Sequence, residues 1–266
     1  MRPKRSLGQN FLKNVGIAEK MASLADIHSG DTVVEVGPGR GMLTRVLLRY
    51  AQRVIAVEKD DLLFEHLRET FQDTDSLELI HQDILESDLE QVIPKGAKIV
   101  ANLPYNIATQ LIVRLTGHAQ RIEAMVVMLQ KEVGQRICAQ AGEREYSALS
   151  VMVGAVFEAS PGFIVGPNNF HPRPRVDSLV IRLDPRIHAV PREDMDLFRR
   201  VVAQAFGQRR KTLRNTLEQL PFLDPDSLSE LCTQAGISLK SRPQEITPEQ
   251  FHVFSRGYAL LLKDTP

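Results

Sequence analysis

A chain of 266 residues, 43% apolar and 25% charged, has the composition of a globular protein with room for one large domain and one small one. The formal net charge of zero excludes a global basic field, so any nucleic-acid surface must be a local patch. Cys138 and Cys232 lack metal-ligand spacing and predict a reduced, cytoplasmic protein with neither a metal site nor a disulfide framework. No apolar run reaches the roughly 20 residues that span a bilayer, and no apolar signal core follows the basic N-terminus.

The first half of the chain predicts helices and strands in alternation. Apolar residues at helical spacing predict a helix over 14–26, and a β-branched run predicts a strand over 32–36. The same patterns predict strands over 53–57, 77–81, 98–101 and 123–129, with helices over 62–71, 107–115 and 131–139. This alternation indicates right-handed βαβ units around a buried, mostly parallel sheet.

The second half of the chain changes in character. Residues 147–157 suit either a buried helix or a strand, whereas 163–165 and 179–183 predict strands that complete a seven-stranded sheet. After Asp184-Pro185 only helices are predicted, including one capped by Asp224-Pro225 and one opened by a capping box at 247–250. We therefore predict an α/β domain over residues 1–185 and a small all-helical domain over residues 186–266.

A glycine-rich loop, Glu35-Val36-Gly37-Pro38-Gly39-Arg40-Gly41, follows the first strand of the predicted sheet. Doubly wound folds bind ligands at the carboxyl ends of their strands, and glycine lets the backbone approach a ligand closely. Residue 42 is Met, so the dinucleotide fingerprint fails at its last position. The acidic residue that opens the loop suits a cationic ligand, such as the ammonium group of an amino acid. Glu35, Gly37, Gly39 and Gly41 are therefore candidate cofactor residues.

Polar residues also end the next three strands. Glu58 ends the second strand and can accept hydrogen bonds from both hydroxyls of a ribose. Asp83 follows the third strand and can accept from an adenine amine, and Asn102 follows the fourth. Any one of them is an ordinary strand end, but together with the glycine loop they predict a nucleoside cofactor site.

The turn Asn102-Leu103-Pro104-Tyr105 combines an amide, a rigid proline and an aromatic ring. An amide oxygen and a nearby backbone carbonyl can accept hydrogen bonds from the two N6 protons of an adenine. The Tyr105 ring can stack on the face of the same base. We therefore predict a site for a flipped-out adenine, with Asn102, Leu103, Pro104 and Tyr105 as its catalytic residues.

Short motifs occur in order along nearly the whole chain, at residues 7–12, 35–41, 58, 82–83, 102–107, 129–133, 170–178 and 208–215. Each motif is short, but the ordered set is specific. It resembles the S-adenosylmethionine-dependent rRNA adenine N6-dimethyltransferase family, and within it the bacterial enzymes that act on the small subunit. The resemblance implies a Rossmann-like class I methyltransferase domain with a helical C-terminal domain that binds RNA or the ribosome.

The resemblance also implies a reaction and further site residues. The reaction is N6,N6-dimethylation of two adjacent adenosines in 16S rRNA during biogenesis of the small ribosomal subunit, with S-adenosyl-L-methionine as cofactor. Asn10 and Leu12 should line the cofactor pocket, and Gly37 should contact the methionine part. Phe170 should face Tyr105 across the target adenine. We expect a monomer without membrane contacts.

Basic residues gather in three places, although the net charge is zero. No acidic residue occurs between Leu197 and Leu217, and Arg173 and Arg175 follow Phe170 closely. An acid-free basic span in a chain with a predicted adenine site favours contacts with RNA phosphates. The predicted RNA contacts are Arg173, Arg175, Arg199, Arg200, Arg209, Arg210, Lys211 and Arg214; the N-terminal cluster is Arg2, Lys4, Arg5 and Lys13.

Three alternatives stay open at the level of the sequence. Macrolide-resistance methyltransferases share the core and act on an adenine of the large subunit; the segment 208–215 and the helical C-terminal third favour the small subunit. A second alternative is an RNA-binding assembly factor without catalysis, which the complete cofactor set disfavours. A third is a dinucleotide oxidoreductase, which Met42 and the turn at 102–105 disfavour.

Overall fold

The computed structural model describes residues 9–208 and 210–264 and groups them into two compact units. The first unit contains the described residues up to Gln135 together with Glu158–Pro185. The second contains Arg136–Phe157 and the described residues from Arg186 onward. The chain passes between the units at the predicted boundary near Arg186, but 136–157 groups with the C-terminal helices rather than with the α/β unit.

Hydrogen bonds explain why 136–157 departs from the sequence-based division. The Tyr146 hydroxyl donates to the Ile246 carbonyl at 2.8 Å, and the Gly142 amide donates to the Gln244 carbonyl at 2.7 Å. Both acceptors lie about 100 residues further along the chain. The local sequence around residues 136–157 therefore gives no indication that this segment belongs to the helical unit.

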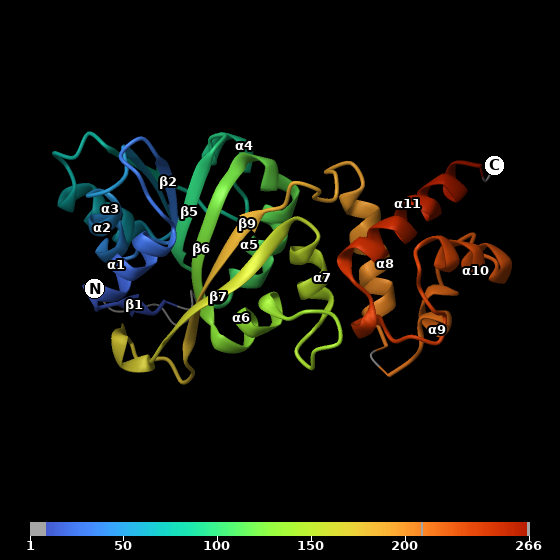
Figure 1. The fold of residues 1–266 in the computed structure, drawn as a ribbon. Coiled ribbons are helices and arrows are strands. Elements are labelled where there is room, and N and C mark those ends of the chain that lie inside the picture. The colour runs from blue at the N-terminus through green and yellow to red at the C-terminus, as the bar shows by residue number, and fades with distance from the viewer. Residues whose placement is uncertain (1–8, 209, 265–266) are drawn as a thin grey trace. The chain divides into compact units, whose positions relative to one another are not determined.

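The first unit is built on a seven-stranded sheet in the order β4-β3-β2-β5-β6-β9-β7 (Figure 1). The strands β2, β3, β4, β5 and β6 pair in parallel, and β9 pairs antiparallel with β6. Their bounds are Thr32–Val36 for β2, Arg53–Glu58 for β3, Leu77–His81 for β4, Ala97–Asn102 for β5, Ile122–Gln130 for β6, Phe157–Val165 for β7 and Ser178–Pro185 for β9. The predicted mostly parallel seven-stranded sheet is confirmed.

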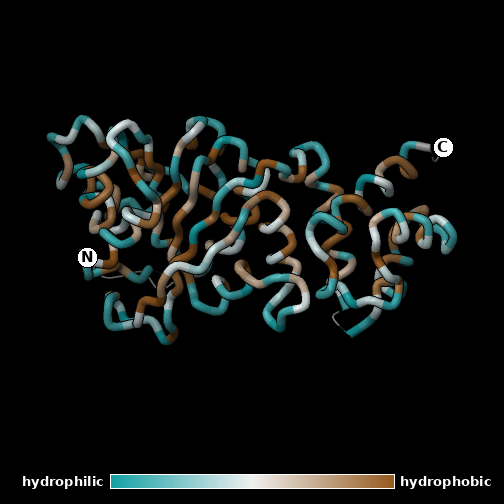
Figure 2. Tube along the Cα trace, viewed as in Figure 1, coloured by the Kyte–Doolittle hydropathy of each residue, from teal (hydrophilic) through white to brown (hydrophobic). Residues whose placement is uncertain are grey.

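Helices of the first unit follow the strands, as the alternation predicted. They are α1 Val15–Leu24, α2 Met42–Leu47, α3 Asp61–Thr70, α4 Leu89–Val92, α5 Ala108–Leu115 and the start of α6 Lys131–Cys138, with the 3-10 turns Thr116–Arg121 and Pro167–Asn169. The central strands β2, β3, β5 and β6 are buried over most of their length, for example at Met125–Leu129 of β6. Figure 2 shows these strands as the most hydrophobic part of the sheet. Burial on both faces is what a parallel sheet covered by helices requires.

A second, two-stranded sheet joins the N-terminal segment to a distant loop. β1, Phe11–Leu12, pairs antiparallel with β8, Phe170–His171, and Leu12 lies opposite Phe170. The Lys13 amide extends this pairing with a hydrogen bond to the Asn169 carbonyl at 2.8 Å. This pairing fixes the N-terminal segment next to the carboxyl ends of the main strands, where the site described below lies.

The second unit is helical. It contains α7 Ala148–Gly154, α8 Met195–Phe206, α9 Leu213–Leu217, α10 Pro225–Gln234 and α11 Pro248–Asp264, with a 3-10 turn over Pro243–Glu245. The ambiguous segment 147–157 is thus the helix α7 followed by the first residue of β7. The Asp224 side chain caps α10 as predicted, and Thr247 and Gln250 form the predicted capping box. None of the helices in the described residues is long and apolar enough to cross a membrane.

Candidate active site

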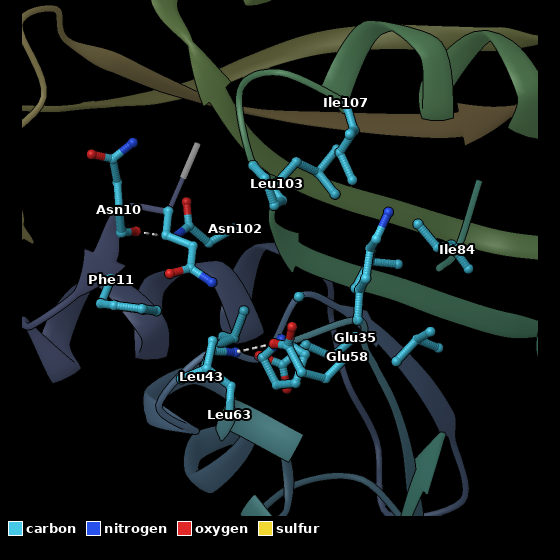
Figure 3. A pocket seen from close by; sticks show the side chains of 18 of the residues that line it. Asn10, Phe11, Glu35, Leu43, Glu58, Leu63, Ile84, Asn102, Leu103 and Ile107 are labelled. Atoms are coloured by element: carbon cyan, nitrogen blue, oxygen red, sulfur yellow. Dashed lines mark hydrogen bonds between the residues drawn. The ribbon is translucent and has the colours of Figure 1, made fainter. Parts of the chain in front are cut away.

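One pocket of the first unit lies at the carboxyl ends of the parallel strands (Figure 3). Its empty volume is about 1060 Å³, including the part that opens to solvent. The glycine loop after β2, the ends of β3 and β5, the loop after β4 and the N-terminal segment all contribute to its lining. Among the predicted residues, those that line it are Asn10, Leu12, Glu35, Gly37, Gly39, Glu58, Asp83, Asn102, Leu103, Pro104 and Tyr105.

Glu35 is a buried carboxylate on one wall of this pocket. Its side chain is 1% exposed, and Oε2 has no hydrogen-bond partner among the described residues. Burial raises the pKa of this carboxyl to about 8. The neighbouring Thr44 hydroxyl opposes this shift, and the nearby Glu58 carboxylate adds to it. Figure 3 shows Glu35 and Glu58 next to each other. A buried carboxyl oxygen without a partner can accept a hydrogen bond from a group that enters the pocket.

Glu58, the last residue of β3, is fixed by backbone amides. Oε2 accepts from the Gly39 amide at 3.1 Å and Oε1 accepts from the Asp60 amide at 2.9 Å. Burial raises the pKa of Glu58, while these amides partly offset the effect of burial. Each carboxylate oxygen can accept more than one hydrogen bond, so Glu58 keeps acceptor capacity for hydroxyl groups in the pocket.

Asp83 lies in the loop after β4 and is paired with Lys59. Lys59 Nζ lies 2.5 Å from Asp83 Oδ2, and the Leu85 amide donates to Oδ1 at 2.9 Å. Partial burial acts to raise the pKa of Asp83, but the bonds from Lys59 and Leu85 lower it on balance. Arg114 of α5, which the motifs do not include, donates to the carbonyls of Ile84 and Ser87 and so supports this loop. No local sequence pattern marks such a contact.

Asn102 ends β5 and binds the N-terminal segment through its side chain. Its Nδ2 donates to the Asn10 carbonyl at 3.0 Å, and Oδ1 accepts no hydrogen bond from the described residues (Figure 3). The Leu103 amide donates to the Met128 carbonyl of β6 at 3.1 Å, which ties the turn to the sheet. The Pro104 carbonyl accepts from the amides of Ile107 and Ala108 at the start of α5. The Leu103 carbonyl accepts no backbone hydrogen bond from the described residues and is therefore a free backbone acceptor of this turn.

Tyr105 is partly exposed, and its hydroxyl forms a hydrogen bond with the side chain of Ser178. The hydroxyls of Tyr105 and Ser178 lie 2.7 Å apart. Burial raises the pKa of the phenol, and the bond to Ser178 opposes this shift. Tyr105 is therefore neutral near pH 7 and is held at a fixed position beside Asn102.

Two predicted site residues do not line the pocket. A Cβ on Gly41 would lie 2.7 Å from the Phe71 ring, so a glycine here lets α2 begin close to the end of α3. Phe170 is 2% exposed and packs in the hydrophobic core with Leu12 and Val180. It is absent from the pocket lining, and that it faces Tyr105 across a bound adenine stays a prediction.

The pocket also has lining residues that the motifs alone did not single out. Phe11 packs against the glycine loop, since a Cβ on Gly39 would lie 2.9 Å from the Phe11 ring. The Arg40 guanidinium lies over the same Phe11 ring, 4.8 Å from its centroid. Lys59, Leu63 and Ile84 line the part near Asp83. Apolar and long aliphatic side chains carry no local signal that separates a pocket wall from a core.

The predicted basic residues differ in exposure. Arg173, Arg175, Arg200, Arg210, Lys211 and Arg214 are exposed. Arg199 is partly buried, lies 3.7 Å from Asp196, and has its pKa lowered by burial. Arg209 lies outside the described residues, as do the predicted cations Arg2, Lys4 and Arg5 and the first part of the motif at 7–12.

The fold and this pocket define a Rossmann-like class I methyltransferase. A parallel sheet carries a glycine loop after β2, an acidic residue at the end of β3 and an Asn-Leu-Pro-Tyr turn at the end of β5, all on one pocket. The computed structure resembles a dimethyladenosine transferase from Plasmodium falciparum, with a TM-score of 0.77 and 25% identity over 94% of this chain and 98% of that one. It also resembles the 23S rRNA methyltransferase ErmE, with a TM-score of 0.70 and 26% identity over 93% of this chain and 99% of that one.

Comparison with known sequences shows to which family of methyltransferases the chain belongs. The family model described as "Ribosomal RNA adenine dimethylase" matches residues 1–259. Proteins named "Ribosomal RNA small subunit methyltransferase A" are 41% identical in Moorella thermoacetica, over 96% of this chain and 92% of the relative, and 43% identical in Magnetococcus marinus, over 94% and 89%. The chain belongs to the ribosomal RNA adenine dimethylase family and is an rRNA adenine dimethyltransferase. The resemblance found in the motifs is confirmed.

Proposed function

We propose that this protein dimethylates N6 of two adjacent adenosines in 16S rRNA with S-adenosyl-L-methionine as cofactor. It acts as a monomer in the cytoplasm during assembly of the small ribosomal subunit. The observation that carries the proposal is the single pocket shared by the acidic strand ends, the glycine loop and the turn at 102–105. A cofactor site and an adenine site must adjoin for a methyl group to pass from one to the other.

The polar groups of the pocket fit the parts of this cofactor. Glu35 Oε2, buried and without a partner among the described residues, suits the ammonium group of the methionine part. Gly37 and Gly39 line the pocket with φ of +68° and +59°, a backbone conformation that glycine adopts without strain. Glu58 would take the ribose hydroxyls and Asp83 the adenine amine, while Asn10 and Leu12 would close the pocket from the N-terminal segment.

The sulfonium of S-adenosyl-L-methionine supplies an activated methyl group and a neutral leaving sulfur. The protein therefore has to activate the nucleophile, since the N6 lone pair of adenine is delocalised into the ring. Asn102 Oδ1 and the Leu103 carbonyl are the two acceptors that would bind the N6 protons and direct the lone pair. The Pro104 carbonyl is used by the first turn of α5, which favours Leu103 over Pro104 for this role. Catalysis is then a matter of positioning and electrostatics, with no side chain as general base.

The target adenine must leave its stack to reach this pocket. The Tyr105 ring would support one face of the base, a contact that contributes about 1–3 kcal/mol. Phe170 would support the other face only if its ring left the core position that it takes in this structure. We therefore assign base stacking to Tyr105 first.

The basic surfaces would bind the phosphates around the target. The exposed residues Arg173 and Arg175 belong to the catalytic unit, whereas Arg200, Arg210, Lys211 and Arg214 belong to the helical one. We propose residues 1–185 as the methyltransferase part and 186–266 as the part that binds RNA or the ribosome. The partly buried Arg199 would contribute less than the exposed arginines.

The names of the relatives favour the small subunit over the large one. Curated relatives between 34% and 43% identical carry the small-subunit name, whereas ErmE, the 23S enzyme, is 26% identical. The proposal is tested by incubating the protein and cofactor with assembled small subunits and with naked 23S rRNA, and by mapping N6,N6-dimethyladenosine by mass spectrometry. We expect two dimethylated adenosines in the small subunit; modification of 23S rRNA alone would overturn the assignment.

A further inference from the structure

We propose that Ser178 is a positioning residue of the active site, which fixes the Tyr105 ring through its hydroxyl. This inference rests on the proposed function, because the fixed ring is the one that would stack on the target adenine. Ser178 opens β9 and lies opposite Gln130 of β6 in the sheet register. The Lys131 amide donates to the Asp177 carbonyl at 3.0 Å, so the backbone on the N-terminal side of Ser178 is also fixed.

The burial of the two hydroxyls determines which one donates. Ser178 is 0% exposed, and among the described residues its side-chain hydroxyl has the Tyr105 hydroxyl, 2.7 Å away, as its hydrogen-bond partner. Since water does not reach Ser178, its proton is satisfied only if Ser178 donates and the phenol oxygen accepts. Tyr105 is partly exposed, so its own proton can be bound by water or by a ligand in the pocket.

The hydrogen bond between Ser178 and Tyr105 restricts the Tyr105 ring at its hydroxyl end. The turn at 102–105 is attached to the sheet at two points, since the Leu103 amide binds β6 and the Tyr105 hydroxyl binds β9. Without the second attachment, the ring is free to shift relative to Asn102. The stacked base would shift with it, away from the acceptors that direct its lone pair. Small misplacements of a reacting group reduce turnover strongly.

The first test compares Ser178→Ala, Tyr105→Phe and the double variant in methylation assays on assembled small subunits. We expect Ser178→Ala to lower kcat about 5- to 50-fold, with the Kd for S-adenosyl-L-methionine unchanged. The double variant should be no worse than Tyr105→Phe, because both changes remove the same bond. Ser255→Ala is the matched control, since Ser255 is 2% exposed and donates to the His252 carbonyl in the other unit.

Two further measurements separate positioning from a loss of stability. Tyr105→Phe leaves the Ser178 hydroxyl buried without a partner, so its Tm should fall, and the double variant should recover part of the loss. With 2-aminopurine in place of the target adenine, Ser178→Ala should weaken the quenching of fluorescence by the Tyr105 ring at saturating protein. Full kcat and full quenching in Ser178→Ala would overturn the inference. If the wild-type protein fails to methylate the small subunit, the proposed function fails instead.

Discussion

The side-chain amide of Asn102 donates to the backbone carbonyl of Asn10 at 3.0 Å, across 92 residues of sequence. This bond joins the end of the central strand β5 to the N-terminal segment that closes the pocket. It also fixes the orientation of the amide, because Nδ2 is used by the protein and Oδ1 is left as the acceptor. In the proposed function, this one side chain would take part both in the cofactor site and in the adenine site.

Replacement of Asn102 by Ala tests which of these two roles dominates. We expect kcat to fall by about 10²–10³, as for the loss of one preorganised transition-state contact. The factor by which the Kd for S-adenosyl-L-methionine rises should be at least about ten times smaller than the factor by which kcat falls. The pairing of β1 with β8 still holds the segment next to Asn10 in place. The measurements are single-turnover methylation and calorimetric titration. Comparable losses in both would show that Asn102 is chiefly a cofactor ligand.

We expect a side chain at Gly39 to be unfavourable for two reasons, a strained backbone and a clash with the Phe11 ring. Gly96 serves as a control that carries the backbone strain without the clash. An Ala at φ +59° costs about 1–2 kcal/mol in backbone energy, and its Cβ would lie 2.9 Å from the Phe11 ring. Gly96 has φ +76°, and no atom lies within 4 Å of the position that a Cβ would take there, so Gly96→Ala carries the backbone cost alone. We expect Gly39→Ala to weaken cofactor binding and Gly96→Ala to leave the Kd unchanged. Equal Kd values would show that Phe11 moves aside without consequence.

The periodicity of the sequence predicts the centre of the sheet because β2, β3, β5 and β6 are largely buried runs, each followed along the chain by a helix. Glu35, Glu58, Asp83 and Asn102 could also be placed together in advance, since parallel strands end at one edge. Long-range pairing was not predictable. The two-residue strands β1 and β8 have no periodicity to read, and 136–157 joins the helical unit through bonds to residues about 100 positions away.

The two residues that did not line the pocket show a related limit. A glycine that contacts a ligand and a glycine that allows close packing cannot be told apart by sequence, and Gly41 lies against the Phe71 ring outside the pocket lining. An aromatic residue beside a proline loop is equally compatible with a pocket and with a core, and Phe170 lies in the core. The sequence predicts which loop such a residue belongs to. Whether the residue contacts the pocket or the core depends on how distant segments pack together.

The basic segment before α9 is expected to bind RNA phosphates. Reversing Arg209 and Arg210 to Glu should weaken binding to 16S rRNA and flatten the dependence of log K on log salt concentration. The slope should decrease by about 0.7–0.9 for each phosphate that the variant no longer neutralises. Lys263→Glu is the control, since Lys263 is another exposed cation of the helical unit. An unchanged slope in the Arg209/Arg210 variant would place the RNA on a different surface.

Cofactor binding is expected to release a proton from Glu35. Burial raises the pKa of this carboxyl to about 8 in the ligand-free protein, so it is mostly protonated at pH 7. A ligand ammonium favours the ionised form, and about one proton should leave for each molecule bound. Calorimetry at pH 7 in phosphate and in Tris measures the release, because these buffers differ in ionisation enthalpy. Glu35→Gln should abolish the difference between buffers; a wild-type protein without such a difference would contradict the role of Glu35.

The same carboxyl should make the ligand-free protein less stable as the pH rises. The pKa of Glu35 is raised from 4.5 to about 8 by folding, so the folded state binds the proton more tightly than the unfolded state. The resulting stability is present at low pH and is lost between pH 4.5 and about 8, at up to about 1.4 kcal/mol per pH unit. We therefore expect the Tm of the wild-type protein to fall between pH 6 and 8 more steeply than that of Glu35→Gln. Glu58, whose pKa is also raised, is present in both proteins, so its burial acts on both Tm curves. Parallel Tm curves for the two proteins would show that Glu35 is already ionised in the free pocket.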